Sequence, residues 1–184
     1  ERDVKVVNTS DADIVAASAT PGVTAVVTWK PLLTEIIERP NTSLVFDSSK
    51  TPGEILDLMV VNSKVLKDNP NLGRALVGAW YETMAVMQAK DARGTAALTH
   101  MARAAGADLA QFEGMLKTTH LYATPQSALA AYTSPDLVKT NDLVRRFSFE
   151  KGLLGEGARS VDAIGIEFPD GKFLGNRNNV KMRF

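Results

Sequence analysis

The sequence predicts an α/β fold, and three observations support that prediction. In the first third of the chain, short runs of β-forming residues alternate with segments that carry helix N-cap residues. Beyond this part, capped segments with apolar residues at helical spacing predominate, which predicts a layer of helices. Hydrophobic residues make up 45% of the chain and charged residues 23%, a balance that lets the chain bury a core.

Four segments are expected to be strands because they are short and rich in β-branched or apolar residues: 4–7, 23–29, 44–46 and 55–61. Helices are expected between the first three of them. One covers 11–18, after the cap candidates Thr9 and Ser10, and the other covers 32–38, after Pro31. This β-α-β-α-β order implies a mostly parallel sheet with helices on its faces.

The middle of the chain is expected to be helical, in segments 64–67, 70–89, 95–105, 109–117, 124–132 and 134–147. Gly106 is a suitable C-cap for the third segment, and Asp108 is a suitable N-cap for the fourth. The long second segment has apolar residues three and four apart, which predicts one buried stripe of Leu72, Leu76, Val77, Trp80, Met84 and Met87. The glycine-rich segment 152–184 is expected to be a wrapping tail with at most one strand, inside 159–168.

Composition and motifs exclude several functions. The formal net charge is zero, without the basic excess of nucleic-acid-binding proteins. The chain has no cysteine, which excludes disulfides, zinc–cysteine sites and thiol nucleophiles. His100 and His120 form no recognisable metal or catalytic motif, and no serine lies in a G-x-S-x-G elbow. The glycines of 152–157 lack the Lys-Ser/Thr pair of a phosphate loop. We therefore expect no catalytic residues, no metal and no cofactor.

Trp29 is the strongest candidate for a ligand-binding residue. It ends the predicted strand 23–29, and α/β folds bind ligands beyond the carboxyl ends of their strands. An indole ring offers a flat apolar wall, a face that attracts cations and one N–H donor. Packing in the core is the competing explanation for this residue.

Glu54 and Asp57 are a second candidate pair. They lie three residues apart, where a polar connector meets the predicted strand 55–61. Carboxylates at such a junction would accept hydrogen bonds from a small cationic or amide solute, because a buried charge needs a partner. Surface charges at a turn, or a structural ion pair, are the alternative interpretation.

Two stretches resemble a known family of binding proteins. VTAVVTWKP, at 23–31, resembles the strand and Trp-x-Pro segment of the taurine, sulfonate and thiamine-precursor type of periplasmic solute-binding proteins. DLMVVNSKVLKDNPNLGRALVGAW, at 57–80, resembles the segment in which a strand returns to the first lobe and a long helix follows. The whole chain is similar to the C-terminal part of the binding proteins encoded beside urea carboxylase systems.

The resemblance implies a type II periplasmic-binding-protein fold. Two α/β lobes are joined by two crossovers, and a hinge closes them around the solute. Thr28, Trp29 and Lys30 are then expected at the cleft, and Glu54 and Asp57 at the hinge. The resemblance implies that residues 1–50 are the end of the second lobe and that residues 51–56 are a crossover. Residues 57–151 are then the returning first lobe, and residues 152–184 are a wrapping tail.

The implied function is solute capture for an ABC importer. Such a protein would bind urea, an amide or a guanidinium-like compound and deliver it to a permease in the inner membrane. It would be periplasmic, or lipid-anchored outside a Gram-positive cell. The family's first half has no counterpart here, and the chain starts at Glu1 without an initiator Met, so we expect a C-terminal portion. Such a portion would expose sheet edges and apolar surface, and we therefore expect it to dimerise.

Two alternatives stay open at this point. The first is an enzyme of the thiamine-pyrimidine synthase type, which shares the fold but needs histidines and other functional residues that this sequence does not offer. The second is an effector-sensing domain of a transcription regulator, which would carry a DNA-binding helix pair upstream.

Overall fold

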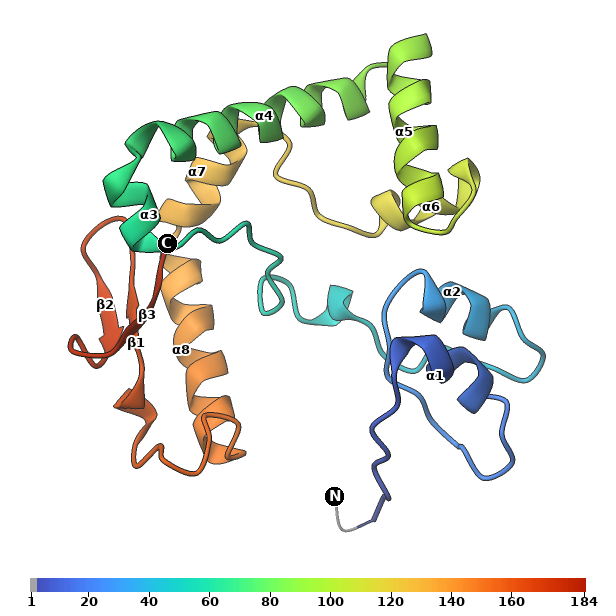
Figure 1. The fold of residues 1–184 in the computed structure, drawn as a ribbon. Helices are drawn as coiled ribbons and strands as arrows, with labels where there is room; N and C mark the ends of the chain where they lie inside the picture. The colour runs from blue at the N-terminus through green and yellow to red at the C-terminus, as the bar shows by residue number, and fades with distance from the viewer. Residues whose placement is uncertain (1–2) are drawn as a thin grey trace. The chain divides into compact units, whose positions relative to one another are not determined.

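The protein is a mixture of helix and sheet, and helices take up about half of the chain. The computed structural model describes residues 3–184 (Figure 1). In this range the α-helices are α1 (Asp11–Ala17), α2 (Leu32–Ile37), α3 (Ser63–Asp68), α4 (Pro70–Gln88), α5 (Ala92–Ala104), α6 (Leu109–Lys117), α7 (Pro125–Thr133) and α8 (Pro135–Glu150). The short 3-10 helices are η1 (Ser48–Lys50) and η2 (Val161–Ala163), and the strands are β1 (Gly165–Glu167), β2 (Phe173–Gly175) and β3 (Val180–Arg183).

The chain divides into two units. Unit 1 comprises Glu1–Asp47 and Ala89–His120, and unit 2 comprises Ser48–Gln88 and Leu121–Phe184. The positions of the units relative to one another are not determined. In unit 1, α1 packs on α2 and α5 packs on α6. In unit 2, α3 packs on α4, and α8 packs on α7 and η2. The assignment of lobes and crossover from the resemblance stays a prediction.

Local signals fix the helix ends, and the predicted helices are confirmed to within a few residues. Asp91 accepts a hydrogen bond from the backbone N–H of Gly94 and so starts α5 three residues before the predicted start. Asp108 and Gln111 form a reciprocal capping box at α6, as the Asp108 signal predicts. Gly106 has a φ of 70° where the chain leaves α5, a conformation that a side chain disfavours.

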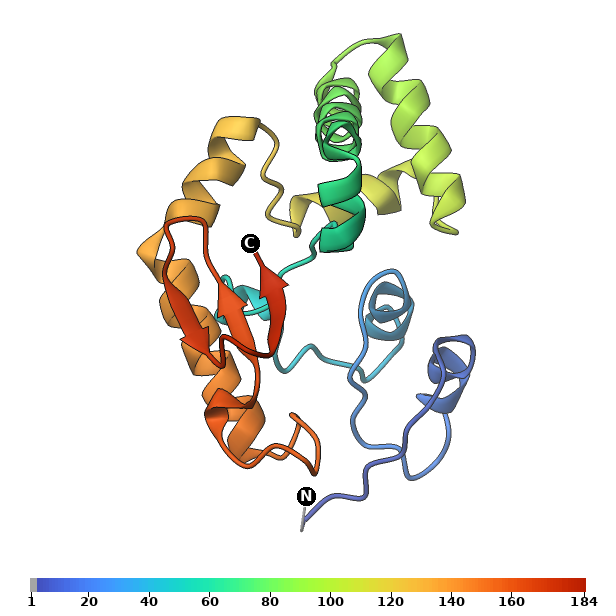
Figure 2. The ribbon, with the colours of Figure 1, turned by 60° about the vertical axis from the view of Figure 1, so that its left-hand side comes forward.

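The sheet of unit 2 is formed by the tail alone. Its order is β2-β1-β3, with β1 antiparallel to β2 and parallel to β3. The predicted strand inside 159–168 is confirmed as β1, whereas β2 and β3 are additional. In Figures 1 and 2 the sheet lies beside α8. The tail therefore forms a second layer of unit 2.

An aromatic cluster joins this sheet to α7. The rings of Phe168 and Phe184 stack with their centroids 5.4 Å apart, and the ring of Tyr132 lies 6.0 Å from that of Phe184. Phe168 and Ile166 are buried, which makes them the centre of the core of unit 2. Each buried side chain of this size contributes about 2 kcal/mol to folding through removal of apolar area from water.

The four segments predicted as strands in the first third of the chain are extended, but none of them forms a β-strand. The prediction that they pair in a sheet is therefore wrong. Within residues 3–184, the backbone groups of 24–28, 44–46 and 55–61 have no backbone hydrogen-bond partner. Most of their side chains are exposed, to 94% at Val27 and 95% at Val45. A β-former run has the same composition whether or not a neighbouring strand is present, and pairing requires that neighbour.

The predicted apolar stripe of α4 is only partly buried. Met84 is buried, while Val77 and Trp80 are about half exposed. The chain as a whole exposes 13984 Å². Even two separate compact bodies, of about 80 and 105 residues, would together expose roughly 10,400 Å² by the size scaling of folded proteins. The units therefore leave apolar surface uncovered that a folded domain normally buries.

Candidate functional site

Trp29 is presented to solvent on a fixed stretch of backbone. It follows the extended segment 23–28 and precedes α2, and 62% of its surface is exposed. Its carbonyl oxygen accepts the backbone N–H of Leu33, which ties it to the first turn of α2. The next side chain is tied as well, because Nζ of Lys30 donates to Oγ1 of Thr118 at 2.8 Å. Core packing is thus not the role of this indole in unit 1.

The residue before the indole carries an unsatisfied hydroxyl group. Oγ1 of Thr28 is shielded from solvent and has no hydrogen-bond partner among the residues that the structure describes. A buried polar atom without a partner costs about 1–3 kcal/mol, so natural proteins rarely keep one without a reason. Three consecutive residues therefore carry different groups. Thr28 has a hydroxyl group without a hydrogen-bond partner, Trp29 has an exposed aromatic ring, and Lys30 has an ammonium group that is anchored on Thr118.

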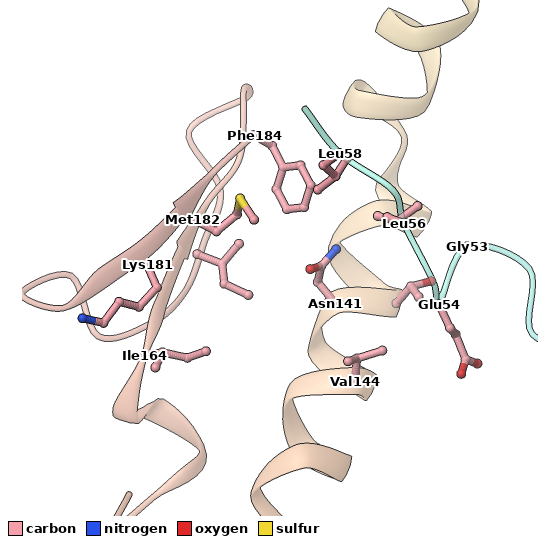
Figure 3. A pocket seen from close by; sticks show the side chains of 12 residues that line it. Gly53, Glu54, Leu56, Leu58, Asn141, Val144, Ile164, Lys181, Met182 and Phe184 are labelled. Atoms are coloured by element: carbon pink, nitrogen blue, oxygen red, sulfur yellow. The ribbon is translucent and has the colours of Figure 1, made fainter. Parts of the chain in front are cut away.

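The predicted acidic pair, Glu54 and Asp57, lies in unit 2, whereas Trp29 belongs to unit 1. Glu54 follows a turn in which its backbone N–H donates to the carbonyl oxygen of Thr51. Asp57 lies three residues further on in the extended segment, and it is exposed. In Figure 3 the carboxylate of Glu54 points away from the neighbouring pocket. Both carboxylates reach solvent and are open to a partner from outside unit 2.

An apolar groove lies beside this segment. It holds about 370 Å³ between the sheet, α8 and the extended stretch that follows Gly53. Figure 3 shows sheet side chains on one side and α8 side chains on the other. The apolar side chains that line it are Leu56, Leu58, Val144, Ile164, Ile166, Met182 and Phe184. Asn141 and Thr140 add polar groups from α8, and Glu54 and Lys181 lie at its borders with their charges directed outward.

A buried ion network holds α8 against the segment that leads into the sheet. Arg145 is only 5% exposed, and its guanidinium contacts Oδ1 of Asp142 at 2.6 Å and Oδ1 of Asp162 at 2.5 Å. Hydrogen bonds from Arg145, and then from Arg146, hold the pKa of Asp142 below its usual value. Burial alone would lower the pKa of Arg145, but its two carboxylate partners outweigh this and raise it. Arg145, Asp142 and Asp162 are not among the residues that line the groove, so we interpret the network as structural.

Hydrogen bonding also lowers the pKa of Asp170, which Lys172 contacts through both its side chain and its backbone. This pair closes the turn between β1 and β2. Among residues 3–184, no group of three or more His, Asp or Glu side chains is placed to hold a metal ion. No helix in the same range is both long and apolar enough to cross a membrane.

Comparison with family models, curated proteins and solved structures gives no match to this chain. The interpretation of the site therefore depends on its residues and on the sequence resemblance.

The sequence interpretation missed the groove and the residues that line it. Val180-Lys181-Met182-Arg183 alternates apolar and charged residues, which is the pattern of a half-buried strand and was sufficient to predict β3. Asn141 and Arg145 are four residues apart on one face of α8, but nothing in the sequence indicates which of the many polar residues of a helix is buried. That depends on the sheet that packs beside it.

Proposed function

We propose that this chain is part of the solute-binding component of an ABC importer, and that the solute is small and nitrogen-rich, such as urea, an amide or a guanidinium-like compound. The observation that supports this most directly is the exposed indole of Trp29 on an anchored backbone. A planar N–H-rich solute stacks well on an aromatic face, and a cationic one gains a further 0.5–2 kcal/mol or so from the ring.

The polar groups around the indole suit the same solute. The hydroxyl group of Thr28 can both donate and accept a hydrogen bond, but its Oγ1 is shielded from solvent, so in this proposal a urea-like solute reaches it only when the backbone around it moves. In this proposal Glu54 and Asp57 accept N–H groups when a hinge closes over the solute, as the resemblance implies. The chain acts as a carrier rather than as an enzyme, and it passes the solute to a membrane permease from a periplasmic or extracellular location.

The uncovered apolar surface fits a chain that is one portion of a larger two-lobed fold. The extended segments 24–28, 44–46 and 55–61 have mostly exposed side chains, and their backbone groups have no backbone partner within the described chain. Further strands of the same two lobes would complete the sheets to which these segments belong. On this proposal the complete cleft requires residues beyond those of this chain.

Calorimetric and thermal-shift titration of the full-length protein with urea, guanidinium and acetamide tests the proposal. We expect saturable stabilisation by at least one of the three. Trp29→Ala should weaken that binding about tenfold or more, while Trp29→Phe should keep most of it. Trp80→Phe, at the other tryptophan of the chain, is the matched control and should leave the affinity unchanged.

Two results would contradict the proposal. If none of the three compounds stabilises the protein, the solute class is wrong. If Trp29→Ala binds as the parent protein does, while circular dichroism shows both to be folded, the indole is not part of the site.

A further inference from the structure

The turn between β1 and β2 contains the one Asp-Gly dipeptide of the sequence, which has no Asn-Gly. Asp170 and Gly171 are both exposed. Among aspartates, one that precedes glycine is the most prone to cyclise on its own backbone, because glycine has no side chain to shield its amide nitrogen. The sequence therefore places its most reactive backbone site in this turn.

The reaction needs no partner other than water. The backbone nitrogen of Gly171 attacks Cγ of Asp170, a C–N bond forms, and one carboxyl oxygen leaves as water with the amide hydrogen and the proton of the carboxyl group. Water then opens the resulting succinimide ring at either of its carbonyl groups. One opening restores aspartate, and the other leaves isoaspartate, in which the main chain runs through the side-chain carbonyl carbon. No oxidation or reduction takes place.

The native turn occupies both of the reacting groups. The backbone N–H of Gly171 donates to the carbonyl oxygen of Phe168 at 3.0 Å. Oδ1 of Asp170 accepts the backbone N–H of Lys172 at 3.1 Å, and Oδ2 lies 2.7 Å from Nζ of the same lysine. The attacking nitrogen and the carboxyl group under attack are therefore each held by another partner.

Lys172 also keeps the carboxyl group in its less reactive form. Its side-chain hydrogen bond, and then its backbone N–H, lower the pKa of Asp170. A protonated carboxyl group releases its oxygen readily as water, whereas a carboxylate does not. The contacts from Lys172 therefore oppose the reaction both by position and by charge.

We infer that Asp170 is the site at which this chain forms isoaspartate, and that Lys172 restrains the reaction in the folded protein. Isoaspartate adds one atom to the main chain inside the turn. The hydrogen bond from the backbone N–H of Phe168 to the carbonyl oxygen of Lys172, at 3.0 Å, spans that atom. Phe168 is buried and stacks on Phe184, so the modification would disturb the core of unit 2. The inference concerns this turn alone and does not depend on the solute proposed above.

Incubation of the full-length protein at neutral pH for several weeks, followed by peptide mapping with mass spectrometry, tests the inference. Electron-transfer fragmentation distinguishes isoaspartate from aspartate at each position. We expect isoaspartate to accumulate at Asp170 before any other residue. It should form about tenfold more slowly than in the free peptide acetyl-EFPDGKFL-amide, because the hydrogen bonds of the turn must open first. Lys172→Met should raise the rate in the protein about twofold to fivefold, the range expected from an exposed ion pair.

Three variants serve as controls. Lys172→Arg keeps a cation within reach of the carboxylate and should isomerise at nearly the parent rate. Lys181→Met removes an exposed lysine of β3 and should leave the rate unchanged. Asp170→Glu can close only a six-membered ring, which forms far more slowly, so the product at this turn should disappear.

Arg145→Met separates restraint within the native turn from general unfolding, because it weakens unit 2 without removing a contact of Asp170. It should raise the rate less than Lys172→Met does. A larger rise would show that the reaction proceeds through unfolding, and it would overturn the role of Lys172, as would equal rates in Lys172→Met and the parent protein. Isoaspartate that accumulates first at another residue, or at none while the peptide reacts, would overturn the assignment of the site. None of these results bears on binding of urea, guanidinium or acetamide.

Discussion

Arg145 on α8 and Asp162 in η2 form an ion pair, with 2.5 Å between Nη1 and Oδ1. The guanidinium is buried, whereas 63% of the Asp162 side chain is exposed. Nη1 also donates to the carbonyl oxygen of Val161 at 3.0 Å. The pair thus fastens the segment that precedes β1 to α8.

Replacing Arg145 with Met is expected to lower the free energy of unfolding of unit 2 by about 2 kcal/mol. The loss stays moderate because Asp162 can rehydrate when its partner is removed. Urea denaturation followed by circular dichroism measures it. Arg146→Met is the matched control: Arg146 also contacts Asp142, at 2.8 Å, but it is exposed, so the expected loss is below about 0.5 kcal/mol. Equal losses in the two variants would refute the special role of Arg145.

The lowered pKa of Asp142 predicts a defined pH dependence. Ionised Asp142 is stabilised in the folded state, so its contribution is complete above the unfolded pKa of about 3.9. It is lost as the pH falls through the folded pKa, which is lower. Asp142→Asn should therefore be destabilising at pH 6, and its difference from the parent protein should shrink as the pH approaches 3.

Urea denaturation at a series of pH values between 6 and 2.5 measures this difference. Glu82→Gln, on the exposed side of α4, is the control and should show little difference at any pH. A constant difference between Asp142→Asn and the parent protein across the series would contradict the assignment.

Gly175, the last residue of β2, and Gly171, in the turn between β1 and β2, are a matched pair of glycines with positive φ. Their φ values are 75° and 79°, so either substitution by Ala carries a backbone cost of about 1–2 kcal/mol. An added Cβ at Gly175 would also collide with the carbonyl oxygen of Ile164, and it would lie 3.3 Å from Nη1 of Arg145. At Gly171 it would meet open space.

We therefore expect Gly175→Ala to destabilise unit 2 by about 2 kcal/mol more than Gly171→Ala does. Thermal denaturation of the two variants side by side tests this. Similar melting temperatures would mean that the close approach of β2 to Ile164 is not maintained in solution.

Asp108→Ala is expected to cost unit 1 about 1 kcal/mol, because it removes the carboxylate that accepts the backbone N–H of Gln111 at 2.8 Å. The loss should be concentrated at α6. Hydrogen exchange of the first amides of α6 reports it directly, and those amides should exchange faster in the variant. Glu113→Ala, in the middle of the same helix, should leave them unchanged.

The helices could be predicted because their signals are local. Asp108 at the start of α6 and Gly106 at the end of α5 act on their own backbone within a few residues, so reading the sequence places them well. The segments 23–29 and 55–61 show the limit of the same approach. Their composition indicates a strand, but a strand exists only when a distant segment pairs with it, and that information lies outside the run itself.

The candidate site could be predicted only in part for a related reason. The place of Trp29 at the end of an apolar run makes it a candidate, and its exposure argues against core packing within unit 1. Its role in ligand binding stays a prediction. The burial of Arg145 and the lining of the groove by Asn141 could not be foreseen, because both depend on the sheet that the tail forms beside α8.

The placement of the two tryptophans has a practical consequence. Trp29 belongs to unit 1 and Trp80 to unit 2, and the sequence contains no third tryptophan. Trp29 is 62% exposed and Trp80 is about half exposed, so water reaches both indoles. Single-tryptophan variants would therefore supply separate fluorescence signals for the two units. A blue shift of the Trp29 emission would report that something has covered the indole, and quenching by iodide would follow the accessibility of Trp80 on α4 independently.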